Sequence, residues 1–550
     1  MSVEASSESD SYQFAPDERP VFAGSPFSPQ HPAWRRAIFA CVGLLTGLCS
    51  AFPNALVTVN VGSISGSLGL YVAQVSWLSA IYVAMNASAN LTLVKARTQF
   101  GIPTVTQALL SAYAAADLLQ FMFPGLASAV LIRAISGVTA AGLTTLTVYY
   151  LMQVFSVKLK PLALVIGMGL TQLGTPLARM VPVELLAVDG WRGLHLIELG
   201  VATGLLAITL AFPLPPSNRS SVFRALDLLT IALIIPAMLL LCGVLNLGRL
   251  EWWMDTPWLG WALAAAVALF ALAGLIETHR AHPLIQFDWL SGTDILRFGA
   301  VALFVRLALA EQTYGAVGLL TAGGLTNDQL RTLFGIVAAA MLAGILTAAL
   351  TLSERRIPWQ VMIAALVIAF GAWIDTDATN LTRPPQLYVS QALLGFGTTL
   401  FIGPALVYGL LRVLRRGVDV LVSFVVLFSV TQNVGGLLGS ALLGTYQVMQ
   451  ARAHAHGLSE HMRASDPGVV HRIRAGADAV AGVVADSAQR VAEGASLLGR
   501  AMTREASVAA YGNVFRFVEI MALMIAIYIG CVLFRGELRR HRSRTSESPA

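Results

Sequence analysis

The stretch LLTIALIIPAMLLLCGVL, residues 228–245, contains no charged side chain and is long enough, as a helix, to cross the roughly 30 Å hydrocarbon core of a bilayer. A second apolar stretch, WLGWALAAAVALFALAGLIE, follows at residues 258–277, and similar runs recur along nearly the whole chain. Hydrophobic residues make up 56% of the sequence and charged residues 12%, with a mean hydropathy of +0.70. A soluble protein carries about twice that share of charge. The sequence therefore predicts an all-α integral membrane protein, because each run can satisfy its backbone hydrogen bonds as a helix within lipid.

The apolar runs predict fourteen transmembrane helices. Their expected positions are 37–60, 75–96, 102–123, 126–153, 161–184, 193–213, 225–246, 258–277, 296–320, 331–352, 359–375, 386–411, 418–446 and 514–535. The first 34 residues are polar and lack an apolar core, so we expect a disordered tail there and not a signal peptide.

The basic residues indicate the orientation of the chain in the membrane. If the amino terminus is cytoplasmic, twenty Lys and Arg residues fall in the inner loops and tails, and the short outer loops hold only Arg192, Arg249, Arg331 and Arg383. This bias predicts that both termini are cytoplasmic. We therefore expect a multi-pass protein of the inner (cytoplasmic) membrane with a basic cytoplasmic tail at 536–550. Basic residues in short loops indicate topology and not nucleic-acid binding.

One outer segment, residues 447–513, is long enough to form structure of its own. Pro467-Gly468 divides it, and after this break apolar residues recur at helical spacing. They are Ile473, Ala477, Val480, Val484, Val491, Ala495 and Leu498. This pattern is typical of an amphipathic helix that caps the outer face of the bundle. The alternative is a docking surface for a periplasmic adaptor protein. The histidines of this segment have no regular ligand spacing, so we expect no metal site.

Several motifs resemble the fourteen-helix drug:proton antiporters (EmrB/QacA type) of the major facilitator superfamily. They are Val59-Asn60-Val61 with Gln74-Val75-Ser76-Trp77; Arg133, Gly137 and Gly142; Gly174-Thr175-Pro176; Gly190-Trp191-Arg192; Asp227 through Glu277 to Leu284; Gln432-Asn433-Val434-Gly435-Gly436; and Tyr511 with Asn513. The resemblance covers about residues 35–535. It implies two pseudo-symmetric six-helix bundles, 35–213 and 291–535, with two inserted helices at 214–290. It also implies a coupling role for Asn60 and conformational roles for Gly137, Gly174, Pro176, Gly435 and Gly436.

The sequence departs from that family at four positions. Thr98 stands where the gating motif after the second helix has Asp, and Ala55 occupies the place of the first-helix Asp. Gln432 replaces an Arg, and Arg179 interrupts the glycines expected after Pro176. A proton-coupling carboxylate therefore has to lie elsewhere in the bundle.

Charged residues inside the predicted spans are the candidates for coupling and substrate binding, because charges in a membrane are costly unless they are paired or hydrated. They are Asp117, Arg133, Arg179, Glu184, Glu198, Arg306, Glu311 and Glu519. We expect Asp117 and Arg133 to lie at equal depth and to pair, because they are about eight residues on either side of a turn at Pro124-Gly125. Arg306 and Glu311 both lie near the middle of one predicted span. They are about 140° apart around the helix, so their side chains should contact different neighbouring helices. Glu184, Glu198 and Glu519 lie near predicted outer boundaries and should reach water.

The sequence thus predicts a proton-coupled exporter of small amphipathic or toxic organic compounds. The chain has no nucleotide-binding motif, so we expect no cofactor and a proton gradient as the energy source. The main alternative is an importer or exporter of a specific metabolite or organic acid, because fold does not set direction. An enzyme is not expected, since no catalytic cluster is evident, and neither is a receptor, since the cytoplasmic loops are short.

Overall fold

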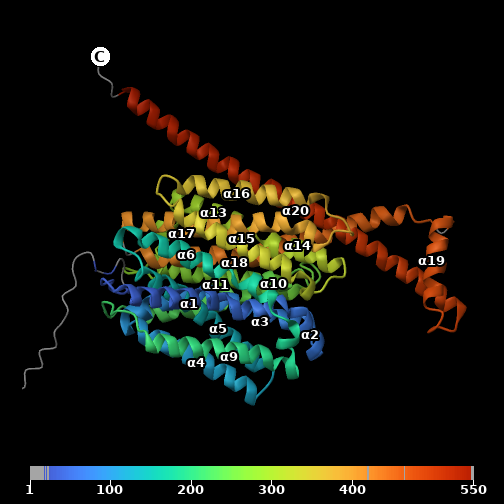
Figure 1. Ribbon diagram of the computed structural model, residues 1–550, viewed down its shortest axis with the longest axis horizontal. Helices are drawn as coiled ribbons and strands as arrows, with labels where there is room; N and C mark the ends of the chain where they lie inside the picture. The colour runs from blue at the N-terminus through green and yellow to red at the C-terminus, as the bar shows by residue number, and fades with distance from the viewer. Residues whose placement is uncertain (1–17, 19, 21–23, 418–419, 464, 547–550) are drawn as a thin grey trace, which may run out of the picture.

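The computed structural model describes residues 18, 20, 24–417, 420–463 and 465–546, and they form an elongated all-α protein (Figure 1). Within this part of the chain there is no β-strand; one isolated bridge joins Pro26 and Ser217. Twelve of the described helical segments are long and apolar enough to cross a membrane. The predicted all-α membrane fold is confirmed, whereas the count of fourteen spans is not.

The two predicted spans outside this set are helical but differ from the other twelve. The span at 102–123 is α4 (Ile102–Met122), which is long enough but less apolar. The span at 296–320 is interrupted at Leu309 and forms the two shorter helices α13 (Thr293–Ala308) and α14 (Ala310–Ala322).

The first part of the chain forms a group of helices packed around α5, drawn in blue to teal in Figure 1. The predicted span 161–184 is divided at Leu173, where Pro176 cannot donate an amide hydrogen bond to the preceding turn. The elements are α1 (Ala33–Val59), α2 (Val61–Leu68), α3 (Val72–Phe100), α4, α5 (Leu126–Met152), η2 (Val157–Leu159), α6 (Lys160–Gln172), α7 (Gly174–Met180), α8 (Val183–Leu186) and α9 (Val188–Ala211). We call this group the N half.

The last part of the chain forms a second group, the C half, in which α15 and α16 pack on α17, and α14, α16 and α18 pack on α20. Its elements are α12 (Phe287–Leu290), α13, α14, η3 (Asn327–Leu330), α15 (Arg331–Leu350), α16 (Ile357–Ile374), η4 (Asp375–Asp377), η5 (Pro384–Leu387), α17 (Tyr388–Arg416), α18 (Leu421–Glu460), α19 (Pro467–Ala479) and α20 (Ser487–Ser546).

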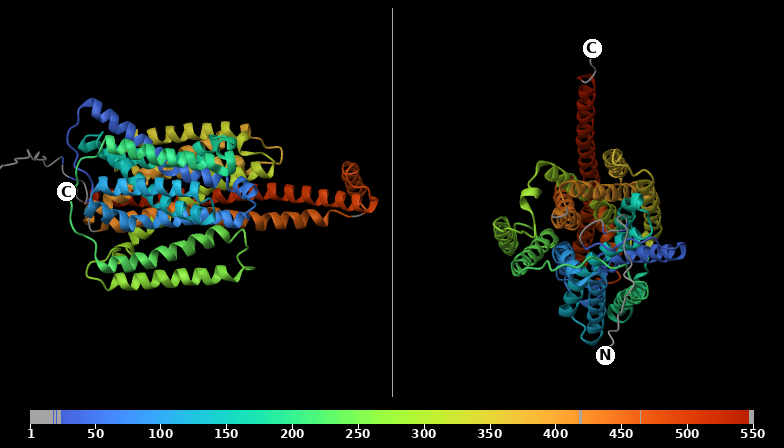
Figure 2. Two further views of the ribbon diagram at one scale, coloured as in Figure 1. Left: turned by 90° about the horizontal axis from the view of Figure 1, so that it is seen from below. Right: turned by 90° about the vertical axis from the view of Figure 1, so that its left-hand side faces the viewer.

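Two helices between the halves, α10 (Ala225–Leu247) and α11 (Pro257–Thr278), pack on each other at the side of the bundle (Figure 2). Helix α10 also contacts α3 and α18. At one end of the pair, Asp227 accepts hydrogen bonds from Lys95 at 2.6 Å and from Arg280 at 2.7 Å, and Arg280 also binds Glu277 at 2.5 Å. This network fastens the inserted pair to α3.

The two halves meet where small residues let the helices approach closely. Helix α6 contacts α15 and α17, and α3 contacts α18. A Cβ atom at Gly403 would lie 2.8 Å from the Cα atom of Val165, and one at Gly169 would clash with Cγ1 of Ile345. Such close packing between membrane helices is typical of small residues.

Helix α19 and the adjoining ends of α18 and α20 project beyond the bundle, and we call this part the stalk (Figures 1 and 2). As predicted, a new helix begins at Pro467, where the Asp466 side chain accepts a hydrogen bond from the Gly468 amide at 2.7 Å. The expected continuous helix is wrong, however, because α19 ends at Ala479 and α20 begins at Ser487. The segment extends away from its end of the bundle and does not cap it.

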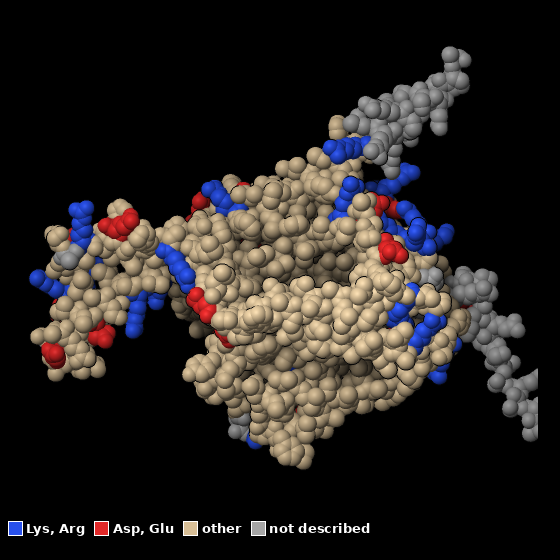
Figure 3. Space-filling model, turned by 180° about the vertical axis from the view of Figure 1, so that it is seen from behind, with Lys and Arg blue, Asp and Glu red and all other residues tan. Residues whose placement is uncertain are grey.

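Both ends of the described chain lie at the end of the bundle opposite the stalk, where Lys and Arg side chains also gather (Figures 1 and 3). Part of the predicted disordered tail is ordered there. The Phe27 amide donates to the Pro216 carbonyl at 3.0 Å, and Gln153 donates to the Phe27 carbonyl at 3.1 Å. Residues 1–17, 19 and 21–23 of that tail lie outside the described residues. The predicted tail from residue 536 continues α20 as far as Ser546; residues 547–550 lie outside the described part.

Candidate functional site

A cavity of about 540 Å³ lies between the N half and the C half. Helices α1, α3, α5, α6 and α7 line it from one side, and α13, α14, α17 and α18 line it from the other. The cavity follows the long axis of the bundle, because its lining runs from Val94 and Arg97 near the end of α3 to Val59 at the opposite end of the bundle. A site shared by two helical groups is the arrangement expected for a solute that is passed between them.

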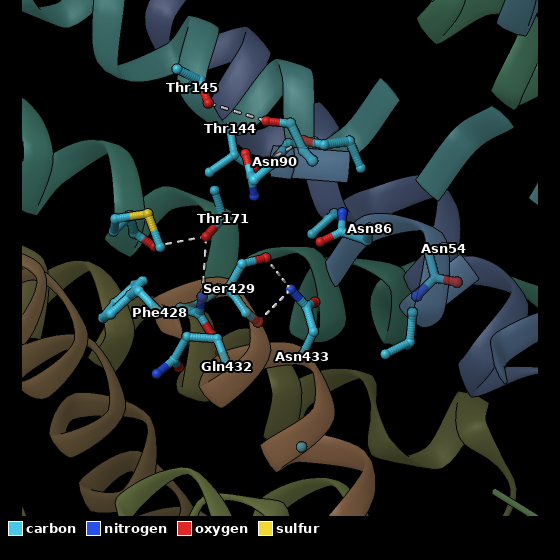
Figure 4. A pocket seen from close by; sticks show the side chains of 18 of the residues that line it. Asn54, Asn86, Asn90, Thr144, Thr145, Thr171, Phe428, Ser429, Gln432 and Asn433 are labelled. Atoms are coloured by element: carbon cyan, nitrogen blue, oxygen red, sulfur yellow. Dashed lines mark hydrogen bonds between the residues drawn. The ribbon is translucent and has the colours of Figure 1, made fainter. Parts of the chain in front are cut away.

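Neutral polar side chains lie among the apolar residues of the cavity wall (Figure 4). Ser429, Gln432 and Asn433 of α18 face polar residues of the N half across the cavity. Asn433 donates to the Ser429 carbonyl at 3.0 Å, whereas both polar atoms of the Gln432 side chain have no hydrogen-bond partner among the described residues. The facing N-half residues are Asn54, Asn86, Asn90, Thr144, Thr145 and Thr171.

The charged residues of the described lining all have the same sign. They are Arg97, Arg179 and Arg306, and no Asp or Glu joins them. Arg97 donates to the Leu93 carbonyl at 3.0 Å, and Arg306 donates to the Gln432 carbonyl at 2.9 Å. Among the described side chains, none of the three arginines forms an ion pair. The described lining of the cavity therefore has a net positive charge.

The end of the cavity beside the stalk is closed by contacts between the halves. Arg179 of α7 donates to Asn327 Oδ1 of η3 at 2.7 Å, and Asn327 Nδ2 donates to the Val59 carbonyl at 3.0 Å and to Asn60 Oδ1 at 3.3 Å. Asn60, predicted to take part in coupling, thus lies at this closure. Arg179 was predicted as one of the charged candidates inside the bundle and as a departure from the family motif. Asn327 was missed because its contact is made across the two halves.

Two predicted glycines make room for Arg306. A Cβ atom at Gly435 would lie 3.2 Å from Arg306 Cγ, and one at Gly436 would lie 3.1 Å from the Arg306 guanidinium. The guanidinium therefore lies against the bare backbone of α18. As predicted from their spacing, Arg306 and Glu311 face different neighbours, since Glu311 does not line the cavity.

Glu311 belongs to a buried pair of carboxylates beside the cavity. The Gln391 amide of α17 donates to Glu311 at 3.2 Å and to Asp375 at 2.9 Å, and Gln312 donates to the Gln391 carbonyl at 3.1 Å. Glu311 and Asp375 each retain one oxygen without a partner among the described residues. Asp375 was missed because it ends a predicted span, where a carboxylate is expected to reach water. Among the described residues no cation pairs with either carboxylate, so the two carboxylates and the amide between them form a site where a proton could bind.

The second buried cluster differs from the predicted Asp117–Arg133 pair. Arg133 binds Glu198 of α9, and His195 lies between the two carboxylates, 3.4 Å from Glu198 and 3.9 Å from Asp117. Asp117 and Glu198 are fully buried, so the expectation that Glu198 reaches water is wrong. Tyr82 lines the cavity, and its carbonyl packs against Gly137 of α5, the helix that also carries Arg133. The ligand atoms of Asp117, His195 and Glu198 lie within 4.8 Å of one another, but the adjacent Arg133 cation disfavours a metal ion.

The remaining predicted motif residues lie at close helix contacts in the N half. A Cβ atom at Gly137 would lie 2.5 Å from the Tyr82 carbonyl, and one at Gly174 would lie 2.8 Å from Ala51. Pro176 is buried in α7, next to the division between α6 and α7. These positions allow α5 to pack on α3 and α7 to pack on α1. Their conformational role stays a prediction.

Comparison with solved structures identifies the fold. The chain is similar to a bacterial homologue of the human drug peptide transporters PepT1 and PepT2 (TM-score 0.55, 10% identity, 92% of this chain and 99% of that one). It is also similar to the proton:xylose symporter XylE of the major facilitator superfamily (0.50, 15%, 91% and 96%) and to the human organic anion transporter MFSD10 (0.50, 14%, 90% and 100%). No family model and no curated protein matches the sequence. The chain thus shares the fold of these transporter structures, whereas the comparisons do not support the narrower EmrB/QacA resemblance.

Proposed function

We propose that this chain is a secondary active transporter that moves a small organic solute across a membrane by alternating access. The cavity between the halves carries this proposal. Its end beside the stalk is closed by the contacts of Asn327 with Arg179 and Asn60, and its lining reaches Arg97 at the end where the termini lie. A transporter needs such a site, exposed to one side of the membrane at a time.

The basic end of the bundle supports a cytoplasmic location for both termini, because Lys and Arg accumulate on the cytoplasmic side of membrane proteins (Figure 3). The cavity would then face the cytoplasm in this conformation, with its outer end closed. This orientation suits export from the cytoplasm across the inner membrane. An importer with the same fold would pass through the same conformation, so direction has to be measured.

The pair Glu311–Asp375 supports proton coupling. A proton bound between these carboxylates would remove one buried negative charge, and its release would restore that charge. Gln391 of α17 contacts both carboxylates, so a change in their charge would act directly on a helix that lines the cavity. The energy source in this account is the proton gradient, and no bound cofactor takes part.

A periplasmic adaptor is a further part of the proposal. The stalk projects beyond the bundle, and Val483 at the turn between its helices is 91% exposed. If an adaptor binds there, Val483→Asp should abolish export from whole cells and spare transport by the purified protein. Equal loss in both assays would argue against an adaptor.

The direct test of the proposed function is uptake or counterflow by the purified protein in liposomes, measured with a panel of labelled small molecules. Solute accumulation that depends on the protein supports the proposal. A folded, correctly inserted protein that moves none of them would contradict it.

A further inference from the structure

We propose that the solutes carried by this protein are organic anions. This inference rests on the proposed function and adds the substrate class. It starts from the charge of the cavity, where Arg97, Arg179 and Arg306 lie in the wall and no described carboxylate balances them. A cation entering this space would be repelled by three guanidinium groups, whereas an anion would be attracted.

The three arginines lie at different depths along the cavity. Counting 1.5 Å per residue, Arg97 lies about 5 Å from the end of α3, and Arg306 lies about 20 Å into α13 from the same end of the bundle. Arg179 lies at the far, closed end. An anion moving through the cavity would therefore meet a positive charge near its entrance, at its centre and beside its closed end.

Arg306 is best placed for direct binding. Its Nε–H is fixed by the Gln432 carbonyl, which orients the planar guanidinium, and Gly435 and Gly436 leave the backbone of α18 open beside it. Neither terminal nitrogen pairs with a carboxylate in the described chain, and Nη2 lies beside Gly436, which itself lines the cavity. A fixed guanidinium binds carboxylate, sulfonate or phosphate oxygens in a bidentate manner.

The other residues that line the cavity indicate the chemistry of the part of the solute that does not contact Arg306. Met168, Tyr314, Phe424 and Phe428 line the same cavity together with the amides of Asn86 and Asn433. Apolar and aromatic side chains favour a hydrocarbon or aromatic body, and the amides offer hydrogen bonds in addition. The expected solute is therefore an organic acid with an apolar or aromatic body and not a small inorganic anion.

Two xanthene dyes of similar size and opposite charge test this inference. The purified full chain in liposomes should transport the anion fluorescein and should not transport the cation rhodamine 6G. Benzoate, benzenesulfonate and phenyl phosphate should compete with fluorescein, and benzyltrimethylammonium should not; the order of the three anions identifies the preferred acidic group. Transport of rhodamine 6G without fluorescein would overturn the anion assignment. Failure to transport either dye or any labelled competitor would instead contradict the proposed function.

Variants of Arg306 locate the site. Arg306→Gln should raise the KM for fluorescein at least about tenfold, because it removes a charge-assisted contact, and Arg306→Lys should restore part of the loss. Arg297→Gln is the matched control, since Arg297 lies on the same helix and is 67% exposed outside the cavity. An unchanged KM in Arg306→Gln would overturn the site. The dye comparison in the unmodified protein remains decisive if the variant does not fold.

Discussion

The guanidinium of Arg179 donates a hydrogen bond to Asn327 Oδ1 at 2.7 Å, and this contact joins the N half to the C half where the cavity ends beside the stalk. The Asn327 side chain also donates two hydrogen bonds to the end of α1. This one side chain therefore makes three hydrogen bonds between the two halves. The residue is neutral and short, and its contacts can be broken at modest cost. These are suitable properties for a closure that has to open in every cycle.

Asn327→Ala should therefore favour opening of this end. A cysteine at Ala55, which is buried in the cavity wall, should react several-fold faster with an impermeant maleimide added on the stalk side when Asn327 is replaced. The measurement requires a background without the four native cysteines. Asn380→Ala is the matched control, because Asn380 lies in an exposed loop and binds Glu505 outside the cavity. Equal labelling rates with and without Asn327→Ala would show that this residue does not hold the closure.

Glu311→Gln and Asp375→Asn should each uncouple transport from the proton gradient. Each replacement imitates the protonated carboxyl, so exchange of solute across the membrane should persist while accumulation against a gradient is lost. Glu184→Gln serves as the control, because Glu184 is 73% exposed. Uphill, protonophore-sensitive transport by both variants and by their double variant would rule out this pair as the coupling site.

Glu198→Gln should destabilise the protein more than Asp117→Asn does. Removing the Glu198 charge leaves the buried Arg133 cation without its partner, and breaking a buried ion pair costs about 3–5 kcal/mol. Among the described residues no hydrogen bond or ion pair joins Asp117 to Arg133, so replacing Asp117 should lower the thermal unfolding temperature less. A larger effect of Asp117→Asn would restore the Asp117–Arg133 pair as the important contact.

The orientation of the chain can be tested with single cysteines. Cysteines at Asp255 and Gly457 should react with an impermeant reagent added to intact cells, and a cysteine at Asn218 should react only after permeabilisation. Asp255 lies in the loop between α10 and α11, Gly457 lies in the stalk, and Asn218 lies near the basic end. Labelling of position 218 in intact cells would reverse the orientation.

The sequence predicted those features that depend on local composition. Apolar runs of membrane length indicated the helices, and basic loops indicated which ends lie together. The pairing of buried charges could not be predicted in the same way, because it depends on contacts between distant helices. Arg133 binds Glu198, which is 65 residues away and lies near a predicted boundary where contact with water is the simpler expectation. Asp375 was missed for the same reason, although Glu311, its partner in the buried pair, was identified from its depth.

The sequence has Ala55 in place of the carboxylate of the family's first helix, and the consequence of this change depends on the three-dimensional packing. With Ala55 at that position and Arg97, Arg179 and Arg306 in the wall, the cavity has a net positive charge. Each of these residues can be found in the sequence, but only the packed helices place the three arginines around one space.

The central claim is that this chain moves solute through the cavity by alternating access at the expense of a proton gradient. The most direct test is fluorescein accumulation by the purified protein in liposomes with an imposed pH gradient, repeated with a protonophore. The account predicts accumulation above equilibrium that collapses when the protonophore is added and that is absent in Glu311→Gln. Accumulation that persists with the protonophore would contradict proton coupling, and the absence of any protein-dependent movement of fluorescein or of the other labelled solutes would contradict transport itself.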